Sequence, residues 1–171
     1  MKRLCGWQHT WQPAFSPAER LAIRRRQGIT PSAWAERNRR LSRAMAAEPG
    51  PWRNDRTPYL VGIMDAVSEP QVEEVVLVKA AQVGFSEAMR NLLGYWIDED
   101  PGPCLLVMPT EPAGKELMDE RVRPLVRGTP ALSQYLTGRA DDAKLSAIHM
   151  TSMSVFIGWA GSPQALASRP I

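Results

Sequence analysis

One short stretch of this sequence has the residue types and spacing needed to bind a phosphate group. The four apolar residues 75–78 are followed by Lys79 and a run of small residues, and Ser86 then opens a segment with helical spacing of apolar side chains. A strand, a tight loop and a helix are the frame of a phosphate-binding loop, in which backbone N–H groups and a helix N-terminus face an anion. The stretch therefore predicts a site for nucleotide phosphates.

The match to the usual pattern G-x-x-x-x-G-K-[ST] is incomplete. Over Lys79 to Ser86 the second glycine falls on Gly84 and the hydroxyl residue on Ser86, but Phe85 occupies the lysine position. Lys79 stands at the first position instead, and a cation can reach the phosphates from either end of the loop. Ser86 would offer its hydroxyl to Mg²⁺. An ordinary strand–helix turn with a chance lysine fits this spacing equally well, so both interpretations stay open at this point.

The elements around this loop predict an α/β fold. We expect residues 75–78 to form a strand buried on both faces, residues 86–97 a helix, residues 104–108 a second buried strand, and Thr110 to cap a helix that reaches about residue 125. This alternation favours a parallel sheet with flanking helices. Residues 145–150 and 153–157 indicate two further strands joined as a hairpin.

The first part of the chain is basic and helical. Capping signals predict a helix from Ser16 to Gly28, a second from Thr30 that carries Arg37, Arg39, Arg40 and Arg43, and a third from Thr57. Residues 1–56 hold twelve Lys and Arg against four acids, whereas the remainder holds nine against fourteen. This split points towards a polyanion, with solvated helix faces as the alternative. The candidate DNA-binding residues are Arg24, Arg25, Arg37 and Arg40.

The turn at Pro49–Gly50 is the best candidate boundary, so we divide the chain into a basic helical segment, 1–50, and an α/β domain, 51–171, which the resemblance given below implies to be a truncated P-loop ATPase domain. Just after the boundary, Trp52 and Tyr59 flank Arg56, a combination that could contact an adenine ring or pack in the core. The acidic residues 98–100 are expected to form a solvated loop.

Composition excludes several classes of protein. No apolar run approaches the roughly 20 residues that a bilayer-spanning helix requires, and no signal peptide is visible, so we expect a cytoplasmic protein with no membrane partner. Cys5 and Cys104 are expected to be reduced thiols. Two lone cysteines and two lone histidines make no metal site.

With these segments in order, the chain resembles the front end of the large terminase subunit of tailed phages, of the lambda-like type, from about Gly28 to Ile171. That family is the ATP-driven motor and endonuclease that packages viral DNA, and its phosphate loop also places the lysine at the first position. The shared segments are Pro31 to Ala35, Pro49 to Trp52, Arg56 to Tyr59, Ile63 to Ala66, Pro101 to Pro103, Met108 to Thr110, and the closing Ser162–Pro163 with Leu166 and Ser168 to Ile171.

The resemblance implies a P-loop NTPase-like sheet, ATP and Mg²⁺ as cofactors, and a role for each residue of the loop. Lys79 would neutralise the phosphates, while the backbone of Gln82, Val83 and Gly84 would cradle them beside Phe85 and Ser86. Arg56 and Tyr59 would lie near the base. The implied partners are double-stranded DNA, the small terminase subunit and the portal, in the host cytoplasm during phage assembly, and self-association is a further option.

The resemblance also implies that the catalytic carboxylates lie elsewhere. In the family the strand that carries an acidic pair follows the segment ending at Ile171, and the nuclease domain comes later still. We therefore expect an ATPase by family, with turnover by these 171 residues left open. The alternatives are a non-catalytic DNA- or protein-binding remnant of a decayed prophage terminase, and a related helicase-like motor.

Overall fold

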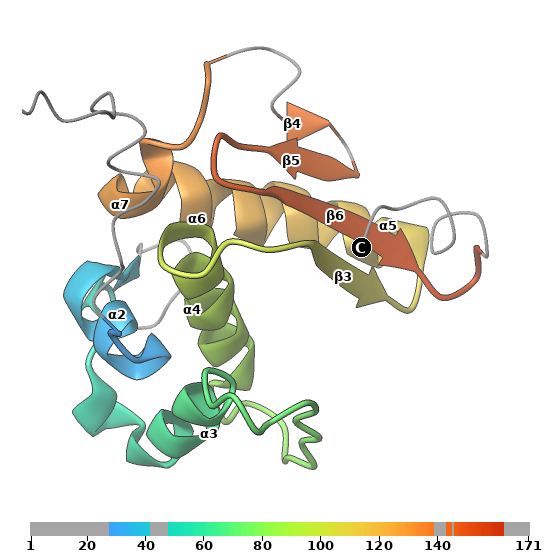
Figure 1. Cartoon of the computed structure of the whole chain (residues 1–171). Helices are drawn as coiled ribbons and strands as arrows, with labels where there is room; N and C mark the ends of the chain where they lie inside the picture. Colours follow the sequence, from blue (N-terminus) through green and yellow to red (C-terminus); the bar gives the residue numbers. More distant parts are fainter. Residues whose placement is uncertain (1–27, 42–47, 139–142, 145, 163–171) are drawn as a thin grey trace, which may run out of the picture.

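The structure, a computed structural model, describes residues 28–41, 48–138, 143–144 and 146–162. These residues form a mixed α/β arrangement of a helical layer and a four-stranded sheet (Figure 1), which confirms the predicted α/β class. In chain order the elements are α2 (Pro31–Asn38), β1 (Arg40–Leu41), β2 (Gly50–Pro51), η1 (Asn54–Arg56), η2 (Pro58–Leu60), α3 (Val61–Ala66), α4 (Phe85–Asp98), β3 (Cys104–Met108), α5 (Glu111–Glu116), η3 (Leu117–Val122), α6 (Arg123–Gly128), α7 (Pro130–Ser133), β4 (Ala143–Lys144), β5 (Ala147–His149) and β6 (Ser154–Trp159).

Helix α2 begins where the sequence predicts and ends earlier. The Thr30 side chain accepts a hydrogen bond from the Ala33 amide, at 3.4 Å, and proline takes the first helical position. The helix stops at Asn38, because Arg39 is extended and Arg40–Leu41 pairs with Gly50–Pro51 as a short antiparallel ladder. The prediction of a helix running through Arg39 and Arg40 is therefore wrong: cross-strand pairing overrides local helix propensity there.

Helix α4 is the centre of the helical layer, and its predicted span is confirmed. The Trp34 ring of α2 lies so close to Gly94 that a Cβ added there would be 2.2 Å from Trp34 Cη2. Trp34 Nε1 and the Tyr135 hydroxyl donate to the two carboxylate oxygens of Asp98, each at 2.8 Å. The expected solvated acidic loop is therefore wrong for Asp98, which holds α2 and the segment after α7 against the end of α4.

The sheet has the strand order β3-β6-β5-β4. Strands β3 and β6 are parallel, with Cys104 opposite Val155 and Met108 opposite Trp159, whereas β4, β5 and β6 pair antiparallel. The predicted hairpin between β5 and β6 is confirmed, but the sheet is mixed and only one of its pairs is parallel. Helix α5 packs on β3 and β6 (Figure 1), where a Cβ on Gly114 would lie 2.9 Å from Ile157 Cγ2.

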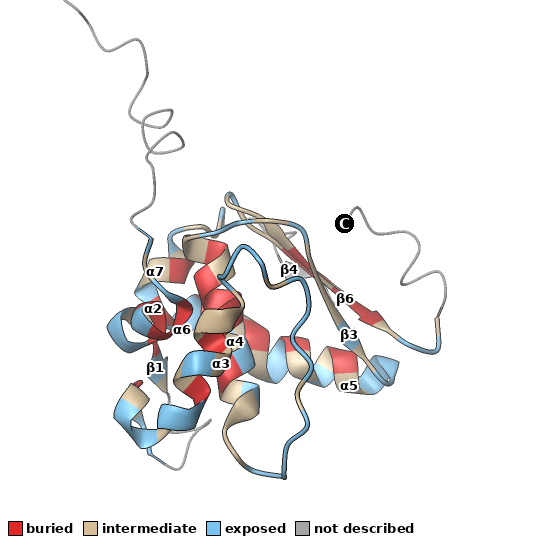
Figure 2. Cartoon of the chain, turned by 60° about the horizontal axis from the view of Figure 1, so that its bottom comes forward, coloured by how far each residue is buried: buried red, intermediate tan, exposed pale blue. Residues whose placement is uncertain are grey.

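The prediction of a buried strand at residues 75–78 is wrong. The segment between α3 and α4 carries no strand from residue 72 to residue 80, and Figure 2 shows it largely exposed. Val76 is 76% exposed and Val78 is 97% exposed. A strand needs a hydrogen-bonded neighbour, and within the described ranges no strand pairs with this segment. The apolar pattern therefore indicated a preference for burial but not the partner that burial requires.

Several expectations fall outside the described residues, namely the helix between Ser16 and Gly28 with Arg24 and Arg25, together with Arg43, Cys5 and the closing segment 163–171. Cys104 of β3 is a free thiol, and burial raises its pKa to about 11. None of the helices among the described residues is long and apolar enough to cross a bilayer.

The Trp34–Gly94 contact predicts that adding one methyl group at position 94 lowers the stability of the fold. Gly94→Ala should lower the free energy of unfolding by about 1–3 kcal/mol, since the wholly buried Trp34 ring has no room to retreat. Urea unfolding measures the loss. Gly62→Ala in α3 is the matched control, because a Cβ there meets nothing within 4 Å. Equal stability of the two variants would contradict the close packing.

Candidate functional site

The turn that precedes α4 has an unusual backbone. Gln82 has a φ of 58° and Gly84 a φ of 77°, so two residues of this turn lie in the left-handed region. Such a conformation is uncommon for a residue with a side chain, and it is found at ligand-binding turns. The Gly84 carbonyl accepts hydrogen bonds from the amides of Glu87 and Ala88, at 3.0 and 3.1 Å, which fixes the start of α4.

The helix start leaves amide groups available. Gly84 is the N-cap residue of α4 and offers no side chain to cap the first turn. The amides of Phe85 and Ser86 have no backbone acceptor among the described residues, as expected for the first positions of a helix. These N–H groups carry the positive end of the helix dipole, where an anion is stabilised.

A cleft of about 1170 Å³ opens at this turn. Its lining includes all eight residues predicted to bind the nucleotide: Arg56, Tyr59, Lys79, Gln82, Val83, Gly84, Phe85 and Ser86. Residues 56 and 59 are separated from the loop by about 20 positions in the chain, and the folding of η1, η2 and α3 against α4 brings them together. The structure thus places the predicted residues around one cavity.

The charge of the cleft is predominantly positive. Among the described residues, five cationic side chains line it, from Arg53, Arg56, Lys79, Arg90 and Arg121, against the two carboxylates of Glu48 and Glu87. Each carboxylate is already paired, Glu48 with Arg56 at 2.9 Å and Glu87 with both Arg39 and Arg90. The cleft therefore suits a multiply charged anion.

Lys79 and Tyr59 each donate a hydrogen bond to a backbone carbonyl of the turn. The ammonium of Lys79 donates to the neighbouring Ala80 carbonyl at 3.3 Å, and the lysine is exposed. The Tyr59 hydroxyl donates to the Val83 carbonyl at 3.1 Å, while the residue stays 56% exposed. Trp52, by contrast, is buried and its Nε1 donates to Asn54 Oδ1 at 2.8 Å. Both aromatic residues line the cleft, Trp52 as a buried part of the core and Tyr59 as an exposed side chain.

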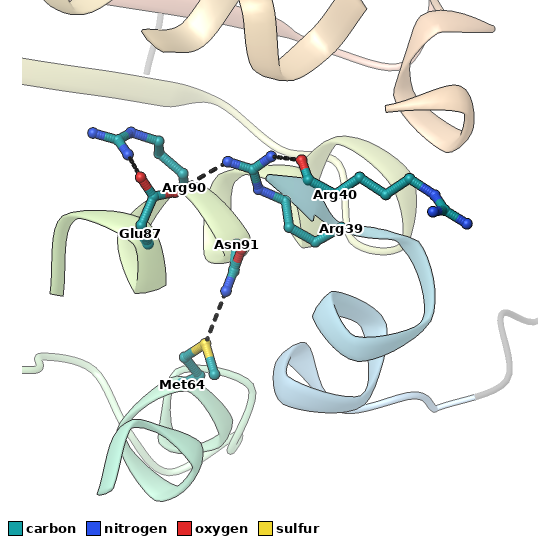
Figure 3. A network of polar contacts seen from close by, with 6 residues as sticks. All are labelled: Arg39, Arg40, Met64, Glu87, Arg90 and Asn91. Atoms are coloured by element: carbon teal, nitrogen blue, oxygen red, sulfur yellow. Dashed lines mark hydrogen bonds and ion pairs between the residues drawn. The ribbon is translucent and has the colours of Figure 1, made fainter. Parts of the chain in front are cut away.

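Sequence reasoning missed Arg39, Glu87, Arg90 and Arg121. Figure 3 shows the Glu87 carboxylate between the guanidinium groups of Arg39 and Arg90. Burial lowers the pKa of Arg39, and the attraction of Glu87 opposes this shift. The spacing of Glu87 and Arg90, three positions apart on one helix, is a signal that could have been found. Arg39 and Arg121 reach the site from other elements, and no local pattern indicates them.

The predicted DNA-binding residues are only partly described. Arg37 lies exposed in the last turn of α2, and Arg40 lies exposed in β1. The buried Arg39 between them faces away from solvent, with a 3% exposed side chain. Arg24 and Arg25 lie outside the described residues.

Comparison with known proteins identifies the class of protein. A family model described as the phage terminase large subunit gpA, ATPase domain, matches residues 46–171. The chain therefore belongs to the phage terminase large-subunit family, as the resemblance predicted. It is 30% identical over 104 residues to the large subunit of the terminase of Enterobacteria phage P21, which covers 61% of this chain and 16% of that protein.

The large subunit of the terminase of Escherichia phage lambda is also 30% identical, over 99 residues, which covers 58% of this chain and 15% of that protein. The chain thus spans about a sixth of the length of these two relatives. No solved structure matches it.

The geometry of the turn predicts the effect of a change at Gly84. Gly84→Ala should cost about 1 kcal/mol of stability, because a φ of 77° places the new Cβ against the backbone. Gln82→Gly, the matched change in the same turn, should be neutral or stabilising, since glycine adopts a φ of 58° without that penalty. Thermal or urea unfolding of both variants measures this, and a stability order reversed between them would contradict the left-handed turn.

Proposed function

We propose that this chain is the ATP-binding part of a terminase large subunit, the ATP-driven motor and endonuclease that packages viral double-stranded DNA. The observation that carries the proposal is the cleft at the start of α4, where five cationic side chains meet the amides of a helix N-terminus. A polyphosphate needs this combination of mobile cations and fixed N–H dipoles.

Each residue of the turn then has a role. Lys79 exchanges its contact with the Ala80 carbonyl for a phosphate oxygen, which is a stronger, charge-assisted hydrogen bond. The backbone of Gln82, Val83 and Gly84 surrounds the phosphates, and Phe85 closes the loop where other phosphate loops carry lysine. Tyr59 and Arg56 form the side of the cleft where the base and ribose lie.

The residues present also fit Mg²⁺ bound together with the nucleotide. The described residues hold no cluster of three His, Cys, Asp or Glu side chains that could ligate a metal alone. Magnesium in nucleotide sites takes few protein ligands, and phosphate oxygens and water supply the rest. The Ser86 hydroxyl lines the cleft and would serve as that protein ligand. The ion supplies neutralisation of the phosphate charge.

The catalytic carboxylates are assigned to the part of the relatives that this chain does not span. Both carboxylates that line the cleft are engaged by guanidinium groups, so neither is placed to orient a water molecule. Nucleotide binding is therefore the activity proposed for these residues, and hydrolysis is proposed only where the acidic pair of the family is also present. The endonuclease, the small subunit and the portal belong to the same proposal.

The P-loop NTPase-like sheet and the division of the chain into residues 1–50 and 51–171 are also proposed. The parallel pair of β3 and β6, with α5 packed on it, supports such a sheet.

A change of Lys79 tests the nucleotide site. Lys79→Ala should weaken the binding of a fluorescent ATP analogue at least about tenfold, as expected for the loss of one charge-assisted contact worth roughly 1.5–3 kcal/mol. Lys115→Ala is the matched control, because Lys115 is a half-exposed lysine in α5 outside the cleft lining. Unchanged affinity of the Lys79 variant would remove the assignment of the loop.

Exposed Arg37 and Arg40 support duplex DNA as a second ligand. Replacing both with Gln should weaken duplex binding and reduce the slope of log affinity against log salt by about two, since each phosphate contact contributes about one. Arg127→Gln, at an exposed position in α6, is the control. A salt slope equal to that of the unchanged chain would show that these arginines do not contact DNA.

A further inference from the structure

The Glu87 carboxylate occupies a position that needs explanation. It lies in the first turn of α4 and lines the cleft, where its negative charge would repel a phosphate group. Two guanidinium groups compensate for it: Arg39 Nη2 donates at 3.1 Å, and Arg90 Nη1 donates to the other carboxylate oxygen (Figure 3). The three side chains together carry a net charge of +1.

The surplus positive charge of this triad faces the cleft through Arg90. Arg90 lines the cleft, whereas Arg39 is absent from the cleft lining and has a side chain only 3% exposed. Arg39 Nη1 also donates to the Arg40 carbonyl at 2.7 Å, which fixes its guanidinium in the interior. The buried Arg39 therefore fixes the Glu87 carboxylate from the protein interior, and Glu87 in turn fixes the Arg90 guanidinium beside the cleft.

Arg90 has donors left for a ligand. Its Nη1 atom donates to Glu87, whereas Nη2 has no hydrogen-bond partner among the described residues. Nε also has none there, but it is buried and not open to the cleft. A guanidinium has five N–H donors in a planar fork, and this fork matches two oxygens of a phosphate group. Ser86 and Arg90 are four positions apart on α4, hence on the same helical face, and both line the cleft.

We propose that Arg90 binds the phosphate groups of the nucleotide, with Glu87 and Arg39 as the residues that position it. The inference rests on the proposed nucleotide site and deepens it. Phe85 occupies the loop position at which a lysine would reach the phosphates, and Arg90, one helical turn beyond Ser86, restores a cation at this end of the cleft.

The first test compares variants of Arg90 in the full chain, with a fluorescent ATP analogue as the probe and adenosine as a competitor. Arg90→Gln should weaken binding of the analogue about tenfold or more and leave the affinity for adenosine unchanged, because adenosine has no phosphate. Arg90→Lys keeps the positive charge but lacks the planar fork of donors. Its affinity for the analogue should therefore lie between those of the unchanged chain and of Arg90→Gln. Arg123→Gln is the matched control, because Arg123 pairs with Asp119 and neither residue lines the cleft.

Folding of the variants is checked by circular dichroism and urea unfolding. Arg90→Gln leaves Glu87 paired with Arg39, so no carboxylate is left buried without a partner. Binding by Arg90→Gln equal to that of the unchanged chain, with binding lost in Lys79→Ala, overturns the role of Arg90 and leaves the nucleotide site intact. Absence of binding by the unchanged chain overturns both.

The second test separates positioning from simple repulsion at Glu87. If Glu87 positions Arg90, Glu87→Gln should weaken binding of the analogue at least about threefold, and this effect should vanish when Arg90 is already Gln. If Glu87 acts only as a negative charge near the phosphates, the same change should strengthen binding in both backgrounds. The second result would overturn the positioning role.

Discussion

The close contact between Trp34 and Gly94 is the constraint on which the site depends. The indole ring lies directly on the backbone of α4, and its Nε1 donates to Asp98 at the end of that helix. The same helix begins at Gly84, and Asn91 near its middle donates to Met64 Sδ of α3 at 3.8 Å. Because α4 is held along its length, its N-terminus is presented to the cleft from a fixed direction, and electrostatic preorganisation of this kind stabilises charge at little reorganisation cost.

Charge compensation sets the character of the cleft. The lining brings cations from η1, the loop before α4, α4 itself and η3, so no single segment of the chain is strongly basic at this point. Glu87 pairs with two arginine residues, with Arg39 in the protein interior and with Arg90 in the cleft lining. The π-helix η3, which carries Arg121 to the cleft, interrupts the regular helix between α5 and α6, and such interruptions are frequent at functional sites.

The mixed sheet supports the helices without contributing side chains to the cleft. Strands β3 and β6 pack against α5 through the small residue Gly114, and the helical run from α5 to α6 then continues towards α4. The segment of residues 72–80 stands apart from this sheet, with its valines exposed.

Local pattern in the sequence determined where several of the helices start. Thr30, Thr110 and Gly84 mark the starts of α2, α5 and α4 because capping and backbone freedom are properties of single residues and their near neighbours. The family also followed from sequence segments in order, and eight of the residues that line the cleft were named from the sequence, whereas Glu87, Arg90 and Arg121 were not. Only the tertiary structure decided that residues 75–78 lack a partner strand, that Arg39 is buried while Arg40 is exposed, and that Asp98 is a packing residue. Strand pairing and side-chain burial depend on segments far apart in the chain. A local sequence pattern does not indicate which distant segment will pack beside it.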